Sequence, residues 1–196
     1  HVVPWNYPSS TMVRGIAPAL AAGCTVVVKP AEQTPVTALL LAQILHEAGL
    51  PPGVCNVVTG TGAQAGAPLV AHPLVRHVTF TGSVATGSRV MQDAARNITS
   101  VTLELGGKSP AVVLADADID AAVADVAGGI FYNAGQTCSA GTRLVIERPV
   151  HARFVQALVA RAAALRWGHG LRNPDMGAIT SHEQLQRIAA HVDGAR

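Results

Sequence analysis

Short runs of β-branched residues alternate with longer stretches in which apolar positions recur with a helical period. In the first half of the chain the short runs predict strands, and the periodic stretches between them predict helices. The expected strands are 25–29, 54–58, 78–81 and 101–105, and the expected helices are 35–48, 64–71 and 84–95. Because alternating strands and helices favour parallel pairing with helices on both faces, the fold class is predicted to be α/β with a parallel, Rossmann-like sheet.

The same rhythm starts again after a Gly-Gly pair at positions 106 and 107. Glycine lets the chain turn where a side chain would clash, so this pair predicts a domain crossing. Strands are then expected at 111–114 and 144–147, and helices at 119–131 and 150–167. The chain is therefore predicted to contain a first domain of residues 1–105 and a second of residues 106–196.

The composition indicates a globular protein and argues against nucleic-acid and membrane partners. Hydrophobic residues make up 49% of the 196 positions and charged residues 13%, which is typical of a globular chain with a large interior rather than a disordered one. The net charge is +2 and the basic residues are scattered, so no nucleic-acid partner is expected. The longest strongly apolar run, 38–45, is far shorter than the roughly 20 residues that span a bilayer, so no membrane association is expected.

The three cysteines, Cys24, Cys55 and Cys138, lie far apart. Their odd number and wide spacing predict neither a disulfide framework nor a metal site, and a reducing, cytoplasmic setting is the simplest interpretation. For Cys24 and Cys55, beside predicted strands, a buried structural thiol is favoured. Cys138 lies in 133–141 (NAGQTCSAG), where small neighbours leave the sulfur approachable and backbone N–H groups free to bind an oxyanion. From this segment alone, a nucleophile and a structural cysteine are equally supported.

Glu104 closes an apolar strand and is followed by the two glycines. Ligands of open α/β sheets bind at the carboxyl ends of strands, so a partly buried Glu104 is a candidate general base. A surface glutamate on an edge strand is the alternative, and the apolar neighbours favour the functional interpretation. Asn6, in PWNYP, could donate its amide to a developing negative charge, but from composition an ordinary turn is the stronger interpretation.

Other segments could hold a nucleotide. Only two of the 14 basic residues are lysines, and one of them, Lys29, follows a predicted strand with Glu32 three positions later. The pair could hold ribose hydroxyls, and a solvated loop is an equal alternative. The segment 80–87 (FTGSVATG) joins a strand to a helix, and its N–H groups suit a phosphate, although the pattern is not GxGxxG. Gly62, in a Gly-Thr-Gly turn, is a weaker signal.

Together these segments resemble the aldehyde dehydrogenase superfamily, of the NAD(P)-dependent, hydrolytic type. PWNYP, KPAEQTP, FTGS, LELGGKSP and NAGQTCSAG follow one another in the family's order and at about its spacing, essentially from end to end. Family members are more than twice this long, so the resemblance implies a partial chain without the first half of the cofactor domain, a later EIFGP-type motif and the oligomerisation strands. Such a fragment is expected to be inactive by itself, and its full-length parent is expected to form homo-oligomers.

The resemblance also implies the chemistry. Residues 1–105 would be the C-terminal part of a cofactor-binding domain and residues 106–196 the N-terminal part of a catalytic domain. Cys138 would attack a small aldehyde, Glu104 would activate the water that hydrolyses the thioester, and Asn6 would join the Cys138 N–H in the oxyanion hole. The cofactor would be NAD, with NADP possible. The implied cofactor-binding residues are Trp5, Lys29, Glu32, Gly62, Gly82, Ser83, Gly87 and Leu105.

Two alternative functions stay open. A CoA-dependent acylating dehydrogenase would pass the acyl group to a thiol, which a water-activating Glu104 argues against. A catalytically incompetent remnant would keep only part of a nucleotide site, which the full set of catalytic candidates argues against. In the family, the helix after Asn6 lines the substrate tunnel, and here it carries Arg14. Arg14 could favour an anionic aldehyde, although a surface ion pair is the favoured interpretation.

Overall fold

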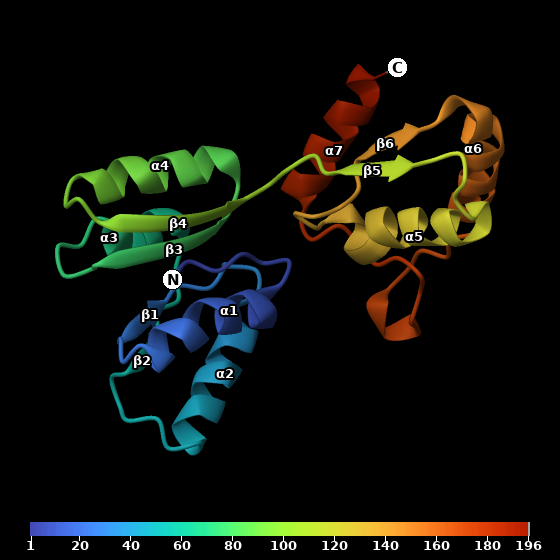
Figure 1. The fold of residues 1–196 in the computed structure, drawn as a ribbon. Helices are drawn as coiled ribbons and strands as arrows, with labels where there is room; N and C mark the ends of the chain where they lie inside the picture. The colour runs from blue at the N-terminus through green and yellow to red at the C-terminus, as the bar shows by residue number, and fades with distance from the viewer. Residues whose placement is uncertain (196) are drawn as a thin grey trace. The chain divides into compact units, whose positions relative to one another are not determined.

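The computed structural model describes residues 1–195. The chain divides into two compact units, which are described separately below: unit 1, His1–Gly106, and unit 2, which begins at Gly107 (Figure 1). Within the described residues, no helix is both long enough and apolar enough to cross a membrane.

After residue 24, unit 1 alternates strands and helices as predicted, whereas the helix over 8–21 was expected only from the family resemblance. Its elements are α1 (Pro8–Ala21), β1 (Val26–Val28), α2 (Pro35–Glu47), β2 (Cys55–Val57), the π-helical turn η1 (Gly62–Gly66), α3 (Ala67–Val70), β3 (His77–Gly82), α4 (Val84–Ala95) and β4 (Ser100–Leu105). The helix expected over 64–71 is instead a π-helical turn followed by a four-residue helix. Pro68 explains the difference, because it has no N–H to donate to the Gln64 carbonyl and an α-helical ladder cannot run through it.

The strands of unit 1 pair in parallel. β1 pairs with β2 and β3 pairs with β4, and Val2 makes parallel bridges to both Lys29 and Phe80. Residue 2 therefore lies between the two strand pairs and links them. In the register of β3 and β4, Thr81 is opposite Glu104.

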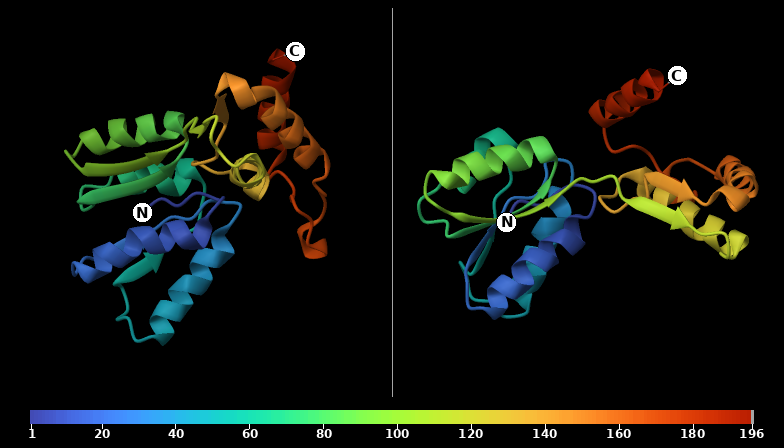
Figure 2. Two further views of the ribbon diagram at one scale, coloured as in Figure 1. Left: turned by 45° about the vertical axis from the view of Figure 1, so that its right-hand side comes forward. Right: turned by 45° about the horizontal axis from the view of Figure 1, so that its top comes forward.

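Two apolar clusters hold unit 1 together. In the first, Met12 and Ile16 of α1 pack with Val28 of β1 and Ala38 of α2. In the second, side chains of α3 and α4 pack on those of β3 and β4: Val70, Val78, Phe80, Val90 and Ala94. Figures 1 and 2 show α4 running along the β3–β4 pair, and α1 and α2 lying side by side. The predicted α/β class with parallel strands is confirmed.

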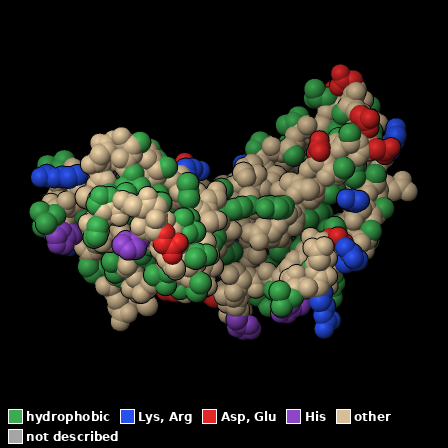
Figure 3. All heavy atoms as spheres, turned by 90° about the horizontal axis from the view of Figure 1, so that it is seen from below, with side chains coloured by type: hydrophobic (Ala, Val, Ile, Leu, Met, Phe, Trp, Pro, Cys, Tyr) green, Lys and Arg blue, Asp and Glu red, His purple; other side chains and the backbone are tan. Residues whose placement is uncertain are grey.

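Helix α2 also has apolar positions on its outer face. Val36, Leu39, Leu40 and Ile44 are between 47% and 73% exposed, and they follow one another at helical spacing. Seen from below, the face of unit 1 that carries this helix shows many hydrophobic side chains (Figure 3).

Unit 2 begins with the predicted strand–helix–strand–helix order. Its elements are β5 (Pro110–Val113), α5 (Ile119–Phe131), the 3₁₀ turn η2 (Tyr132–Gly135), β6 (Arg143–Ile146), α6 (Arg148–Ala163), the 3₁₀ turn η3 (Gly170–Arg172) and α7 (His182–Gly194). β5 and β6 are parallel, and the fully buried Phe154 of α6 packs against β5 and α5 residues. Helix α7 was not predicted.

The predicted helix 150–167 ends earlier than expected, at Ala163. The chain after it forms a loop, residues 166–176, which is called the excursion below. Within it, Trp167 and Met176 form a parallel β-bridge. The Asp175 carboxylate closes the excursion, because it accepts hydrogen bonds from the backbone and the guanidinium of Arg166 at 2.9–3.0 Å. These contacts compete with continuing the helix, which the periodicity of the sequence could not indicate.

Candidate active and cofactor-binding sites

The candidate nucleophile, Cys138, lies in a loop of unit 2. The loop begins where the backbone changes from the right-handed to the left-handed conformation. Helix α5 ends at Phe131, and Asn133, Ala134 and Gly135 then have φ of 51°, 56° and 74°. Tyr132 ends the helix with a ψ of 134°. The three left-handed residues after it turn the chain sharply, and such a conformation costs energy for a non-glycine residue. The loop that follows leaves Cys138 exposed.

Hydrogen bonds of Gln136 hold this loop in shape. The Gln136 side chain accepts a hydrogen bond from the Thr180 backbone N–H at 2.9 Å and donates one to the Asn133 carbonyl at 3.0 Å. Ala140, two residues after the cysteine, is buried. A Cβ on Gly107 would lie 3.7 Å from the Cys138 carbonyl oxygen. The loop is thus anchored on both sides of an exposed sulfur.

The candidate base is placed by β4 and meets an arginine from α1. Alternation along the strand turns Leu103 and Leu105 toward the core cluster and leaves Glu104, with 50% of its side chain exposed, on the other face. Glu104 is therefore more exposed than the partial burial that we expected. The Arg14 Nη2 lies 2.9 Å from the Glu104 Oε1, so the expected surface ion pair of Arg14 exists, and its partner is the candidate base.

Lys29, Glu32 and Gly62 come together at the carboxyl ends of β1 and β2. The Glu32 Oε1 accepts a hydrogen bond from the Lys29 Nζ at 3.1 Å and another from the Gly62 N–H at 2.6 Å. Burial opposes ionisation of this carboxylate, but hydrogen bonds from its own backbone N–H, from Lys29 and from Gly62 outweigh it, so that the pKa of Glu32 is lowered. Lys29 is buried, with only 3% exposed, whereas the Glu32 side chain is 42% exposed.

The two glycines of the segment 80–87 have packing roles in unit 1. A Cβ on Gly82 would lie 2.5 Å from the Phe80 ring, and a Cβ on Gly87 would lie 2.6 Å from the Leu105 Cδ2. Gly87 therefore lets α4 approach the end of β4. Ser83 caps α4, because its hydroxyl accepts a hydrogen bond from the Thr86 N–H.

Trp5 and Asn6 are half-buried in the turn before α1, which begins at Pro8. Asn6 and Glu104 lie in unit 1, whereas Cys138 lies in unit 2. The expectation that Cys24 is a buried structural thiol is wrong, because Cys24 is exposed. It stands before β1 begins, in the turn that Gly23 forms with a φ of 77°.

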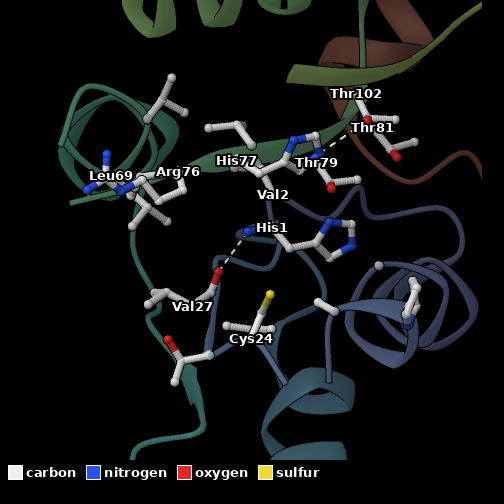
Figure 4. Close-up of a pocket in the computed structure, with 18 of the residues that line it drawn as sticks. His1, Val2, Cys24, Val27, Leu69, Arg76, His77, Thr79, Thr81 and Thr102 are labelled. Atoms are coloured by element: carbon white, nitrogen blue, oxygen red, sulfur yellow. Dashed lines mark hydrogen bonds between the residues drawn. The ribbon is translucent and has the colours of Figure 1, made fainter. Parts of the chain in front are cut away.

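A cleft of about 760 Å³ in unit 1 was not foreseen from the sequence. It is lined by residues of α1, α3, β3 and β4 and by residues 24–27 at the start of β1, and both Arg14 and Glu104 contribute to its wall. Figure 4 shows His77, Thr79, Thr81 and Thr102 along its strand side. Only the alternation of polar residues along β3 and β4 could have indicated this face.

A parallel α/β unit with glycine-rich turns at its strand ends is typical of dinucleotide-binding enzymes. The chain belongs to the aldehyde dehydrogenase family, because the model described as "Aldehyde dehydrogenase family" matches residues 1–196.

Two related aldehyde dehydrogenases support this assignment. The chain is 46% identical to betaine aldehyde dehydrogenase 1 of Oryza sativa subsp. japonica over 196 residues, which cover 100% of the chain and 39% of the relative. It is 48% identical to betaine aldehyde dehydrogenase 2 of Rhizobium meliloti (strain 1021), over 96% of the chain and 39% of the relative. The chain thus spans about two fifths of the length of these relatives.

Solved structures give the same picture. A betaine aldehyde dehydrogenase from Staphylococcus aureus, crystallised in complex with NAD⁺, matches with a TM-score of 0.95 and 39% identity, over 98% of this chain and 38% of that one. The HpcC protein of Thermus thermophilus matches with a TM-score of 0.94 and 48% identity, over 98% of this chain and 38% of that one.

Proposed function

We propose that this chain is the segment of an NAD-dependent aldehyde dehydrogenase that carries the nucleophilic cysteine and the general base. The observation that carries the proposal is the exposed Cys138 in an anchored loop of small residues, within a chain that belongs to this family over its whole length. In this proposal unit 1 binds the cofactor and unit 2 supplies the nucleophile. The relatives' greater length supports the view that further segments complete the enzyme.

The residues of unit 1 fit a dinucleotide. A carboxylate with a lowered pKa stays ionised and acts only as a hydrogen-bond acceptor, so Glu32 suits ribose hydroxyls, and Lys29 holds it in place. The N-terminus of α4, after Gly82 and Ser83, offers N–H groups for a pyrophosphate. Trp5, Gly62, Gly87 and Leu105 complete the proposed cofactor contacts. The bound NAD⁺ would supply the hydride acceptor.

The protein's own groups would do the rest of the chemistry. The Cys138 thiolate adds to the aldehyde carbonyl, and a new carbon–sulfur bond forms while the carbonyl oxygen becomes an oxyanion. The Asn6 amide and the Cys138 backbone N–H donate hydrogen bonds to that oxyanion. Loss of hydride from the same carbon leaves a thioester on the cysteine.

Glu104 would take part in the second half-reaction. It accepts a proton from water, the resulting hydroxide attacks the thioester carbonyl, and the carbon–sulfur bond breaks to release a carboxylic acid and the thiolate. In a CoA-acylating enzyme a thiol would replace this water. An exposed carboxylate at the end of β4 favours the hydrolytic reaction.

The test uses the full-length enzyme that contains these residues. Cys138→Ala should abolish aldehyde-dependent NADH formation and leave NAD⁺ affinity, measured by calorimetry, close to that of the wild type. Cys24→Ala is the matched control, because Cys24 is also exposed and should be dispensable. Normal turnover by Cys138→Ala would refute the assigned nucleophile. Acceleration by added CoA would favour the acylating reaction.

A further inference from the structure

We propose that Arg14 is a positioning residue for the hydrolytic step, and that it acts by holding the Glu104 carboxylate in a working orientation. The inference rests on the proposed role of Glu104 as the base that activates water. It is carried by the contact between the Arg14 Nη2 and the Glu104 Oε1 at 2.9 Å. Ninety positions separate the two residues in the sequence, and both lie in unit 1.

The backbones that carry the two side chains are firmly held. Arg14 lies in α1 between Met12 and Ile16, which are 0% and 3% exposed and pack in the first core cluster. Glu104 lies between Leu103 and Leu105, which pack against the second cluster. The mobility that remains is therefore in the side chains themselves.

Glutamate has three side-chain torsions, and half of the Glu104 side chain is exposed. A side chain of this kind samples several rotamers when nothing restrains it, and a base that is wrongly oriented cannot accept the proton. A guanidinium is planar and permanently charged, so it can hold one carboxylate oxygen in a defined direction. A general base needs only its other oxygen to face the water.

Direct binding of an anionic aldehyde by Arg14 is the competing role. The guanidinium already contacts a carboxylate within its own unit, and both groups line the same cleft. An anionic substrate bound by the remaining N–H groups of Arg14 would place a second negative charge beside Glu104 and would disturb the proposed base. The observed pairing therefore favours positioning over substrate binding.

The experiment measures the decay of the acyl-enzyme in the full-length protein. After a single turnover, quenched samples give the rate of thioester hydrolysis separately from the rate of NADH formation. Arg14→Met should slow hydrolysis by roughly 2- to 5-fold, the effect of losing one exposed ion pair, for neutral and anionic aldehydes alike. The rate of NADH formation in the burst should not change. Arg14→Lys should restore part of the lost rate.

Two controls separate the possible roles. Arg96→Met removes another exposed, ion-paired arginine of unit 1, whose partner is Asp93, and it should leave hydrolysis unaltered. In a Glu104→Gln background, Arg14→Met should have no further effect, because its action passes through Glu104.

Three results would contradict parts of this scheme in different ways. A rise in KM for anionic aldehydes alone, with hydrolysis unaltered, would show that Arg14 binds substrate. An equal loss from Arg14→Met with and without Glu104 would show that Arg14 does not act through Glu104. Normal hydrolysis in Glu104→Gln would refute the proposed base itself, whatever Arg14 does.

Discussion

The buried ammonium of Lys29 lies 3.1 Å from the half-exposed carboxylate of Glu32. The same carboxylate oxygen accepts a hydrogen bond from the Gly62 N–H. Glu32 therefore links the segments that follow β1 and β2. The arrangement fixes a negative charge where a parallel sheet offers its ligand site.

This charge predicts the cofactor preference of the proposed enzyme. Glu32 would accept ribose hydroxyls and repel a 2′-phosphate, so NAD should be preferred to NADP. Glu32→Gln should lower the ratio of kcat/KM for NAD to that for NADP by on the order of tenfold, the usual effect of one hydrogen bond to a charged group. Glu47→Gln, at an exposed carboxylate of α2, is the control. An NADP preference that is unchanged by Glu32→Gln would rule out the charge argument.

The proposed role of Asn6 as an oxyanion donor gives a second prediction. Asn6→Ala should slow the addition of Cys138 to the aldehyde by on the order of 10²–10³, as for other oxyanion-hole donors, with little change in NAD binding. Stopped-flow measurement of the NADH burst would report the loss. Asn56→Ala removes a surface asparagine that binds the Gly53 carbonyl and should have no such effect. An unaltered burst would return Asn6 to a turn-forming role.

The three thiols should differ in reactivity. Burial raises the pKa of the Cys55 thiol, so at neutral pH Cys55 should react with iodoacetamide more slowly than either exposed cysteine. Cys138 should be labelled first, because its loop is expected to activate it, and Cys24 is the informative competitor because it is also exposed. Peptide mass spectrometry over a time course gives the order. Labelling of Cys24 before Cys138 would contradict the assignment of the nucleophile.

The turn after α4 predicts a stabilising substitution. Ile98 is 93% exposed and has a φ of 56°, a conformation that costs a β-branched residue roughly 1–2 kcal/mol. Ile98→Gly removes this strain but makes the unfolded chain more flexible, so the net gain in the free energy of unfolding should be about 0.5–1 kcal/mol. Ile98→Val keeps the branched Cβ and should bring no gain. Thermal and denaturant unfolding would measure both variants.

The excursion after α6 predicts a pH dependence. The Arg166 guanidinium and backbone N–H lower the pKa of Asp175 from 3.8 to about 2. A lowered pKa means that the pair stabilises the fold fully above pH 3.8, and that this contribution is lost as the pH falls through about 2. NMR titration should place the Asp175 midpoint near 2. Arg166→Met should move it toward 3.8, whereas Arg161→Met should move it much less. A midpoint unaffected by Arg166→Met would contradict the clamp.

The sequence predicted the regular parts of the fold because their signals are local. Helices α4 and α5 have the predicted bounds, since apolar periodicity and a capping Ser83 or Asp118 coincide there. The misses have two causes. The pairing of Asp175 with Arg166 after α6 is a side-chain contact that apolar periodicity does not report. Pro68 is a local signal in the sequence, and it divides the expected helix between η1 and α3.

The candidate sites show the same limit. The clustering of Lys29, Glu32 and Gly62 follows from strand ends meeting at one edge of a parallel sheet, a rule that can be applied to the sequence. The contact of Arg14 with Glu104 joins a helix to a strand 90 positions away, and no local pattern encodes it. The exposure of Cys24 depends on the turn that Gly23 forms, and the sequence does not indicate which way this turn directs the chain.

The position of Val2 between β1 and β3 has a consequence for how unit 1 folds. The amide of Val2 donates to the Thr79 carbonyl and its own carbonyl accepts the Thr81 N–H, while the Val3 N–H donates to Lys29. The two strand pairs can form from neighbouring segments, but they cannot merge until residue 2 enters the gap between them. Because the bridge from Val2 to Phe80 joins positions far apart in the sequence, we expect it to form after the local strand pairs. Amide exchange at Val2 would therefore report the joining of the two halves, rather than the formation of either one.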